Sequence, residues 1–404
     1  MHCPTLLRIG GTGRSPAGAG LRRSPSSTVP PTIMRAVSLE LINFRNFEHQ
    51  AVALGPGVNL FYGKNAQGKT NLLESLSILS TAKSFRQGRE RDWIRFGADA
   101  ARVLLTYQAY GDTHTLELRI LPDARKEILA NGLPIARNSE LALKFCTVLF
   151  EPGHLNLVKE SPEQRRRFLD TAIGQLKPRY AGALEDYHRI MGHKNVLLRR
   201  GGDAVQIEVF NERLAVLGGY LTLMRGSYVN KLAQHAAAHH GRLSGGAEAL
   251  SVEYSSFLGR SPEADDLAAL QQSLREELQD ALWQEQERGL CLVGPHRDDV
   301  ELSINGTSAR TFGSQGQQRS AALSLKLAEC DLVQETVGEP PLLLLDDVMS
   351  ELDRGRQQYI RQSLGGRQAV ITTCATARGA KEATVFTVKD GVIEEWAPKS
   401  KKGG

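Results

Sequence analysis

The stretch that begins at residue 63 reads Gly63-Lys64-Asn65-Ala66-Gln67-Gly68-Lys69-Thr70 and follows the strand-like run 58–62. It fits the phosphate-loop pattern G-x-x-x-x-G-K-[ST], in which backbone N–H groups turn inward onto phosphates. Lys69 is suited to reach the β- and γ-phosphates, the Thr70 hydroxyl is suited to hold Mg²⁺, and the following helix offers its positive end. The stretch therefore predicts a nucleoside triphosphate site over residues 63–70, with a helix after it.

The composition is that of an ordinary globular protein. The chain has 404 residues, 41% apolar and 24% charged, with a formal net charge of +5, and this length allows two or three compact units. No run approaches the roughly eighteen apolar residues that a membrane span needs, so we expect a soluble protein without a membrane partner. The mild basic excess favours an acidic partner such as nucleic acid. The five cysteines are never paired as C-x-x-C, which suits a reducing cytoplasm and argues against a structural zinc.

Changes in pattern along the chain suggest four segments. Residues 1–33 contain no acid and no apolar periodicity. We therefore expect a disordered leader, of which a transit peptide is one form, or a start codon assigned upstream of Met34. Residues 34–160 alternate apolar and polar side chains as strands do and carry the phosphate loop. Residues 161–288 have helical periodicity and predict an inserted lobe. Residues 289–404 return to strand patterns.

The strand-rich segment contains two groups of basic residues. Arg45 precedes the phosphate loop closely enough to approach the phosphates, although a lone arginine at a strand end is commonly a surface residue. The run 83–97 carries five basic residues against two acids, interleaved with Phe85 and Trp93. This mixture suits DNA binding, with cations for phosphates and rings for stacking, and it equally suits a solvated helix face with two anchoring aromatics. The candidate DNA contacts are Lys83, Arg86, Arg89 and Arg91.

The lobe is predicted to contain an antiparallel helical hairpin. Apolar residues recur at alternating spacings of three and four from Ile207 to Tyr228, and a shorter stripe runs from Tyr180 to Met191. Gly201-Gly202-Asp203 separates the two stripes. At 1.5 Å per residue each arm would reach about 35 to 50 Å, which describes a lobe rather than a long coiled coil. A further helix is predicted after Ser261-Pro262-Glu263.

The last segment holds two motifs that complement the phosphate loop. Ser314-Gln315-Gly316-Gln317-Gln318-Arg319 opens a helix that is expected to run to about Val337, and its serine cap and glycine make a second anion site. The apolar run 342–345 reads as a buried parallel strand that ends in Asp346-Asp347. Carboxylates at that end of a strand face the ligand crevice. We expect Asp346 to hold Mg²⁺ with Thr70, and Asp347 to polarise the attacking water.

Taken together, these motifs resemble the Walker A, signature, Walker B and D-loop segments of ABC-type ATPases, split around a helical insertion as in SMC and Rad50 heads. The finer spelling resembles the RecF family, from about Met34 to the C-terminal region: Lys-Ser-Phe-Arg at 83–86, Arg-Arg-Arg-Phe-Leu-Asp at 165–170, Gly-Pro-His-Arg-Asp-Asp at 294–299, Ser-Gln-Gly-Gln-Gln-Arg at 314–319 and Asp-Asp-Val-Met-Ser-Glu-Leu-Asp at 346–353. The fold class implied is an α/β ABC-type ATPase with a mixed sheet and an inserted helical lobe.

The resemblance also implies a function. It implies a cytoplasmic protein of DNA repair, replication and the SOS response that binds ATP with Mg²⁺ and both single-stranded and gapped double-stranded DNA. ATP would drive head-to-tail homodimerisation, followed by slow hydrolysis stimulated by DNA, and the mediator proteins RecO and RecR would be partners in loading recombinase. Arg45 matches an arginine that touches the γ-phosphate in Rad50-like heads. The residues assigned to catalysis are Lys69, Asp347 and Ser314, and those contacting nucleotide include Arg45, Ser314, Gly316 and Gln317.

The chain departs from the wider ABC pattern in three places. Asp347 stands where a catalytic glutamate is usual, Thr372-Thr373-Cys374 stands where the switch histidine is expected, and no clear Q-loop glutamine occurs near Glu151. Two alternatives share the nucleotide motifs. An ABC transporter subunit would need a membrane partner and has no reason for a helical hairpin between its halves. A structural SMC- or Rad50-like ATPase would need far more heptad sequence.

Overall fold

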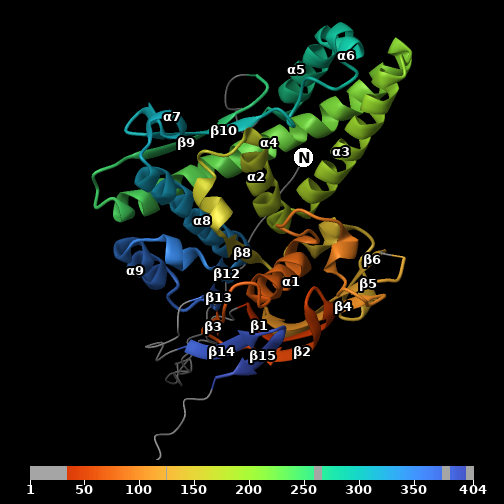
Figure 1. Cartoon of the computed structure of the whole chain (residues 1–404). Coiled ribbons are helices and arrows are strands. Elements are labelled where there is room, and N and C mark those ends of the chain that lie inside the picture. The colour runs from red at the N-terminus through yellow and green to blue at the C-terminus, as the bar shows by residue number, and fades with distance from the viewer. Residues whose placement is uncertain (1–33, 124, 259–265, 375–382, 397–404) are drawn as a thin grey trace, which may run out of the picture. The chain divides into compact units, whose positions relative to one another are not determined.

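A computed structural model describes residues 34–123, 125–258, 266–374 and 383–396 (Figure 1). The predicted leader over residues 1–33 lies outside the described residues, as does the predicted helix start at 261–263. All described residues belong to one compact unit, Thr32–Gly404.

The phosphate loop is carried by a six-stranded sheet with the strand order β15-β14-β3-β13-β12-β8. Its strands pair in parallel except for β15, which runs antiparallel to β14. Every residue of β12 is buried, as a parallel strand covered on both faces requires. The buried strand predicted at 342–345 is confirmed, and its neighbour β13 is buried over residues 369–372. The bounds are β3 Val58–Tyr62, β8 Thr147–Phe150, β12 Leu342–Asp346, β13 Ala369–Thr373, β14 Ala383–Lys389 and β15 Val392–Glu395.

A second six-stranded sheet is antiparallel throughout, with the order β2-β1-β4-β5-β6-β7. An Asn131-Gly132 turn joins β6 to β7, and both residues have positive φ, 50° and 78°, as a type I′ turn requires. Helix α1, Lys69–Thr81, contacts strands of both sheets. Because it is covered on two sides, it buries residues all round. The bounds are β1 Arg35–Phe44, β2 Phe47–Ala53, β4 Ala101–Ala109, β5 Asp112–Ile120, β6 Lys126–Ala130 and β7 Leu133–Pro134.

The helical lobe contains the predicted hairpin (Figure 1). Helices α3, Pro178–Arg199, and α4, Ala204–Leu243, pack together and are joined by a short turn at residues 200–203. The two predicted apolar stripes are buried or half-buried along their whole length, so the hairpin is confirmed. Helix α5, Leu267–Asp280, lies against α4 so closely that a Cβ built on Gly219 would stand 3.0 Å from the backbone nitrogen of Gln271. The lobe also includes α2 Pro162–Leu176 and α6 Leu282–Arg288.

A small sheet joins the lobe to the C-terminal segment. Strand β10, Asp299–Ile304, pairs with β9, Leu250–Ser255, on one side and with β11, Thr307–Ser308, on the other. The boundary expected between residues 288 and 289 thus separates two strands of one sheet. Helix α8, Gln315–Val337, begins at Ser314 as expected and packs along α4. The remaining elements are α7 Ala309–Phe312, α9 Arg354–Ser363 and the 3₁₀ turns η1 Glu90–Trp93, η2 Asn138–Leu141, η3 Pro152–Asn156 and η4 Val348–Glu351.

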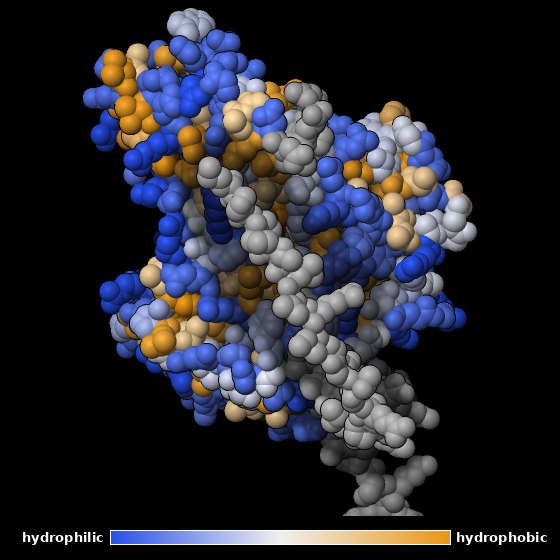
Figure 2. Space-filling model, turned by 180° about the vertical axis from the view of Figure 1, so that it is seen from behind, coloured by the Kyte–Doolittle hydropathy of each residue, from blue (hydrophilic) through white to orange (hydrophobic). Residues whose placement is uncertain are grey.

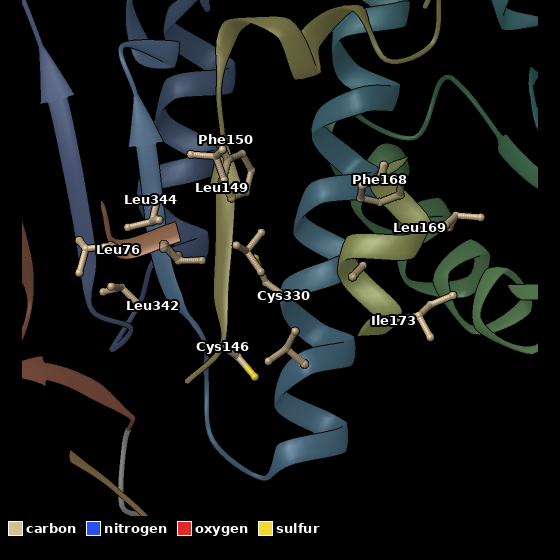
Figure 3. Packing of buried hydrophobic residues seen from close by; sticks show 14 of the residues in the cluster. Leu76, Cys146, Leu149, Phe150, Phe168, Leu169, Ile173, Cys330, Leu342 and Leu344 are labelled. Carbon is tan, nitrogen blue, oxygen red and sulfur yellow. The ribbon is translucent and has the colours of Figure 1, made fainter. Parts of the chain in front are cut away.

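The core is continuous across these layers. Figure 3 shows Leu149 and Phe150 of β8 between Leu344 of β12 and helix α8, with Phe168 of α2 on the far side of that helix. Leu344 is fully buried and the other three are at least 92% buried. The edge strand of the phosphate-loop sheet is therefore covered by the signature helix and the first lobe helix.

Buried charges anchor the lobe to the Gly294–Asp299 loop. Arg225 of α4, 2% exposed, donates to both carboxylate oxygens of Asp170 and to the carbonyl of Pro295. Arg165 of α2 makes a two-pronged pair with Asp299, with both distances 2.7 Å. Such bidentate pairs fix orientation as well as distance. The Arg-Arg-Arg and Arg-Asp-Asp motifs therefore hold two segments of the chain together.

Apolar side chains remain on the surface of the lobe. Figure 2 shows a mostly polar face with apolar side chains gathered at its upper end, over the helical lobe. Val205, Val209 and Val216 of α4 and Trp283 of α6 are 47–72% exposed. Among the described residues, no helix combines the length and apolarity that crossing a bilayer requires.

Candidate nucleotide site

The phosphate loop contacts three other segments: the end of β13, the turn between β1 and β2, and the β14–β15 hairpin. The N–H of Gly63 donates to the carbonyl of Thr373 at 3.3 Å. Gly68 has φ 109°, and a Cβ there would stand 2.6 Å from the Asn46 side chain, so this position requires glycine for both conformation and space. At the loop's centre, the Gln67 amide oxygen accepts from the N–H of Asp390 at 2.6 Å. The motif predicted the loop, but its contacts with the C-terminal hairpin were not predicted.

Lys69 and Thr70 lie at the first turn of α1, as predicted. The Lys69 ammonium is inside the curve of the loop, 2.7 Å from the carbonyl of Gly63 and 2.8 Å from that of Lys64. The Thr70 hydroxyl donates to Oδ1 of Asp346 at 3.1 Å. Thr372 donates to the same oxygen at 2.7 Å. The two residues expected to hold Mg²⁺ are thus in direct contact, and their oxygen donors suit that hard cation.

Asp347 has an unusual backbone and an incompletely bonded side chain. Its φ of 49° is left-handed, which is uncommon outside glycine. Its N–H donates to the Thr372 hydroxyl at 3.0 Å, and its Oδ2 lies 3.2 Å from Sγ of Cys374. Its Oδ1 is buried and has no hydrogen-bond partner among the described residues. An oxygen in this state can accept a hydrogen bond from a water molecule, as the role expected of Asp347 requires.

Arg45 is bonded to protein groups beside the phosphate loop. Its guanidinium donates to both carboxylate oxygens of Glu74 on α1 and to the carbonyl of Asp92. Glu74 is fully buried and the Arg45 side chain is 14% exposed, so this arginine neutralises a buried carboxylate. The neighbouring Asn46 contacts the loop instead, donating to the carbonyl of Gln67 at 3.0 Å. The γ-phosphate role of Arg45 stays a prediction.

The signature segment forms a second prepared helix end. Ser314 and Gln317 cap α8 reciprocally, with side chain to backbone bonds of 3.3 and 2.8 Å. Arg356 of α9 donates to the carbonyl of Gly316 at 2.8 Å and pairs with Asp353, so the signature turn is linked to the D-loop of the same chain. Within the described ranges, no hydrogen bond or ion pair joins residues 314–319 to residues 63–70.

The basic run divides into buried rings and exposed cations. Trp93 is 3% exposed, with the Lys126 ammonium over its ring, and Phe85 packs half-buried against the core. Trp93 is thus buried away from any base, whereas Phe85 remains partly exposed. Arg86 donates to Asn71 at 2.7 Å, whereas the side chains of Lys83, Arg89 and Arg91 have no ion pair in the described part of the chain. The fully exposed ring is Phe96, at 101%.

Glu151 is a further acidic group near the site that sequence reasoning left open. It follows β8, and burial raises its pKa to about 7, a shift opposed by Lys326 and reinforced by Asp346. Its carboxylate lines a cavity of about 1070 Å³ that also borders Lys83, Arg86 and Arg167. The cavity lining mixes cations with carboxylates such as Glu160 and Glu163, so it is not a purely basic groove.

The comparisons with known proteins cover almost the whole described chain. The sequence model of the family described as RecF/RecN/SMC N terminal domain matches residues 36–393. A DNA replication and repair protein RecF from Alkaliphilus oremlandii is 39% identical over 362 residues, which are 88% of this chain and 99% of that protein. A protein of the same name from Listeria monocytogenes serotype 4b is 38% identical over 372 residues, 90% of this chain and 100% of that one. The chain belongs to the RecF family.

Solved structures agree with the RecF assignment and confirm the predicted fold class. A structure described as the recombination mediator protein RecF-ATPrS in the RecFOR pathway is 33% identical, with a TM-score of 0.85 over 90% of this chain and 99% of that one. An SMC head domain from Pyrococcus furiosus, bound to the C-terminal domain of ScpA, has a TM-score of 0.52 at 16% identity over 90% and 96% of the two chains. That second likeness concerns the fold alone. The RecF fold is thus an ABC-type ATPase head with a mixed sheet and an inserted helical lobe.

Proposed function

We propose that this chain is an ATP-driven protein of recombinational DNA repair and replication-fork maintenance. The observation that carries the proposal is the contact between Thr70 and Asp346 beside Lys69, which assembles a phosphate and Mg²⁺ site in a RecF-family chain. The relatives are DNA replication and repair proteins by name, and one solved neighbour is a recombination mediator described with an ATP analogue. The proposed setting is the cytoplasm and the SOS response.

ATP binding follows from the charge pattern of the loop. The Lys69 ammonium is the buried cation among neutral N–H donors, so it is the group that meets the triphosphate charge. Mg²⁺ held by Thr70 and Asp346 would neutralise further phosphate charge. Asp347 orients a water molecule toward the γ-phosphate through its unpartnered Oδ1. An aspartate has one methylene fewer than the usual glutamate, and slow hydrolysis is the expected result.

The second half of the site comes from a second copy of the chain. Ser314 and Gln317 cap the start of α8, and Gly316 lies in its first turn, where backbone N–H groups lack intrahelical acceptors and the potential is positive. Among the described residues, no hydrogen bond or ion pair joins this helix end to the phosphate loop of the same chain. Two heads that meet head to tail bring each signature segment to the partner's γ-phosphate. ATP therefore drives homodimerisation, and hydrolysis reverses it.

DNA and mediator proteins are the proposed partners. The exposed cations Lys83, Arg89 and Arg91, with Arg86, supply contacts to the phosphates of single-stranded and gapped double-stranded DNA. DNA bound there stimulates ATP turnover, because the run continues directly from α1, the helix that carries Lys69. RecO and RecR are the mediator partners that family membership suggests for loading recombinase.

The deciding experiment measures ATP turnover by the full chain with and without gapped DNA. Wild type is expected to hydrolyse ATP slowly and to accelerate when gapped DNA is added, whereas Lys69→Ala binds no ATP. Lys231→Ala, which removes an exposed lysine of α4 far along the sequence, serves as the matched control. An ATP turnover rate that does not change when gapped DNA is added would favour a structural or transport ATPase. An unchanged ATP affinity in Lys69→Ala would contradict the assignment of residues 63–70 as the phosphate loop.

A further inference from the structure

Cys374, which follows β13, contacts two of the three residues assigned to catalysis, Lys69 and Asp347. Its Sγ lies 3.5 Å from Nζ of Lys69 and 3.2 Å from Oδ2 of Asp347. It also lies 2.7 Å from Oδ1 of Asn65 in the phosphate loop. One sulfur atom thus bridges the loop to the carboxylate that follows β12.

The other described cysteines are in a different situation. Cys146, Cys291 and Cys330 are buried, and Cys374 is the exposed one among the four thiols in the described ranges. Figure 3 shows Cys146 and Cys330 among the apolar side chains around β8 and α8. Those thiols fill space in the core, where a free cysteine behaves as a small apolar group. The thiol of Cys374 instead forms hydrogen bonds with polar side chains of the phosphate loop and with Asp347.

The hydrogen-bond count at Cys374 is constrained. A thiol has one proton to donate, and the Lys69 ammonium already donates to the sulfur. The S–H can therefore point to Asp347 or to Asn65 but not to both, and the Asn65 amide can turn its NH₂ toward the sulfur when the thiol faces Asp347. In that arrangement Oδ2 of Asp347 is fixed, and the buried Oδ1 is left as the acceptor for water.

The main chain of Asp347 has a conformation that neighbouring groups must stabilise, and its carboxylate needs a separate contact to fix its orientation. A left-handed φ of 49° in a non-glycine residue persists only where neighbouring groups hold it. The two bonds from the Asp347 N–H, to the hydroxyl and the carbonyl of Thr372, fix the main chain. The contact from Cys374 is the one that holds the carboxylate itself, among the described residues.

We propose that Cys374 is a positioning residue for ATP hydrolysis, whose thiol joins the phosphate loop to Asp347 and orients that carboxylate. The inference rests on the proposed ATPase function. Cys374 lies in the segment where ABC-type ATPases have the switch histidine. Its thiol is a neutral hydrogen-bond donor that acts through Asp347 and does not contact the γ-phosphate.

A double-mutant cycle tests the proposal in the full-length protein. Cys374→Ala should lower kcat roughly fivefold, the effect of one lost hydrogen bond, with ATP affinity nearly unchanged. Cys374→Ser should recover most of that loss because it keeps a donor. In the Asp347→Asn background, Cys374→Ala should have no further effect, since a residue that acts through another gives non-additive changes. Single-turnover assays make the slow variants measurable.

Several outcomes would overturn the inference. An equal relative loss in both backgrounds would mean that Cys374 acts independently of Asp347. A changed ATP affinity with unchanged kcat would assign the thiol to Lys69 and nucleotide binding. A lowered thermal midpoint in Cys374→Ala would indicate a merely structural role. If Lys69→Ala abolishes ATP binding while the cycle is additive, this inference alone fails; if Lys69→Ala binds ATP normally, the proposed function fails as well.

Discussion

His296 is held as a neutral imidazole by two neighbours of opposite hydrogen-bonding character. The carbonyl of Cys291 can only accept, so Nε2 of His296 carries the proton in that 3.2 Å contact. Nδ1 is then the acceptor for the hydroxyl of Tyr187 at 2.8 Å. Burial lowers the pKa of His296 to about 4. Protonating Nδ1 would break the bond from Tyr187, so the network and the burial act in the same direction.

This arrangement predicts a loss of stability in acid. The pKa of His296 is about 4 when folded against 6.5 when unfolded, so the unfolded chain binds more protons between these values. The contribution of neutral His296 to the free energy of unfolding is therefore fully present above pH 6.5. It decreases as the pH falls toward 4, by up to about 3 kcal/mol in total. His296→Gln keeps a donor to the Cys291 carbonyl and should show a smaller fall in unfolding free energy between pH 7 and pH 4.5 in urea titrations. Identical pH dependence in both proteins would contradict the assignment.

Single residues differ in how far their roles follow from sequence. Lys69, Thr70 and Asp346 lie as predicted because the phosphate-loop spacing and the strand end dictate their geometry. The burial of Trp93 and the pairing of Arg45 with Glu74 could not be predicted in this way. Whether an aromatic ring is exposed, or an arginine faces phosphate or Glu74, depends on which distant strands and helices pack there, and a local pattern carries no information about that packing.

At the scale of elements, the contact between α4 and α5 predicts a sharp difference between two glycines of one helix. A Cβ on Gly219 would stand 3.0 Å from the backbone nitrogen of Gln271, whereas a Cβ on Gly241 meets nothing within 4 Å. Gly219→Ala should destabilise the fold by about 1–3 kcal/mol because α5 must move away. Gly241→Ala should be neutral or stabilising by about 0.5–1 kcal/mol through helix propensity. Chemical denaturation measures both, and equal effects would contradict this packing.

The basic run after α1 predicts a change in the salt dependence of DNA binding. Neutralising Arg86, Arg89 and Arg91 should reduce the slope of log affinity against log salt by up to about three, because each released counterion contributes roughly 0.9. Arg86 should contribute least, since it already bonds to Asn71. Replacing two exposed lobe arginines, Arg200 and Arg213, with glutamine provides the control. An unaltered slope in the triple variant would leave the run as a solvated surface.

Elements with local periodicity were predictable, and those built from distant segments were not. The α3–α4 hairpin follows from apolar spacing within one stretch of sequence. Strands β9 and β10 pair although two helices, α5 and α6, lie between them in the sequence, so no local sequence pattern predicted this pairing. Asp298 and Asp299 were read as part of a motif, but their partners Tyr254 and Arg165 lie elsewhere in the chain.

For the whole molecule, shared active sites predict complementation between two inactive chains. Lys69→Ala loses nucleotide binding, and Ser314→Arg places bulk and charge where the helix end should meet a γ-phosphate. A dimer of one chain of each kind has one composite site with both lesions and one with neither. The mixture should therefore recover modest ATPase activity, measured at concentrations where wild-type heads pair. No recovery under those conditions would count strongly against shared sites.

Asp347, which is proposed to position the attacking water, gives a second test of ATP-driven pairing. Asp347→Asn should bind ATP but fail to activate water, so it should accumulate as an ATP-bound dimer in sedimentation or light scattering. Ser314→Arg should bind ATP as a monomer. A monomeric Asp347→Asn chain at saturating ATP would mean that the γ-phosphate does not bridge two heads.

The strand order of the phosphate-loop sheet has a consequence for synthesis of the chain. Strand β3 has β13 on one side and β14 on the other, and Asn59 bonds to Ala369, 310 residues further along. The antiparallel sheet, by contrast, uses only strands between Arg35 and Pro134. On the ribosome, the antiparallel sheet can form early. Strand β3, by contrast, can pair with β13 and β14 only after almost the entire polypeptide has emerged. The nascent protein would therefore gain its affinity for nucleotide in the last moments of translation, and truncated products would have none.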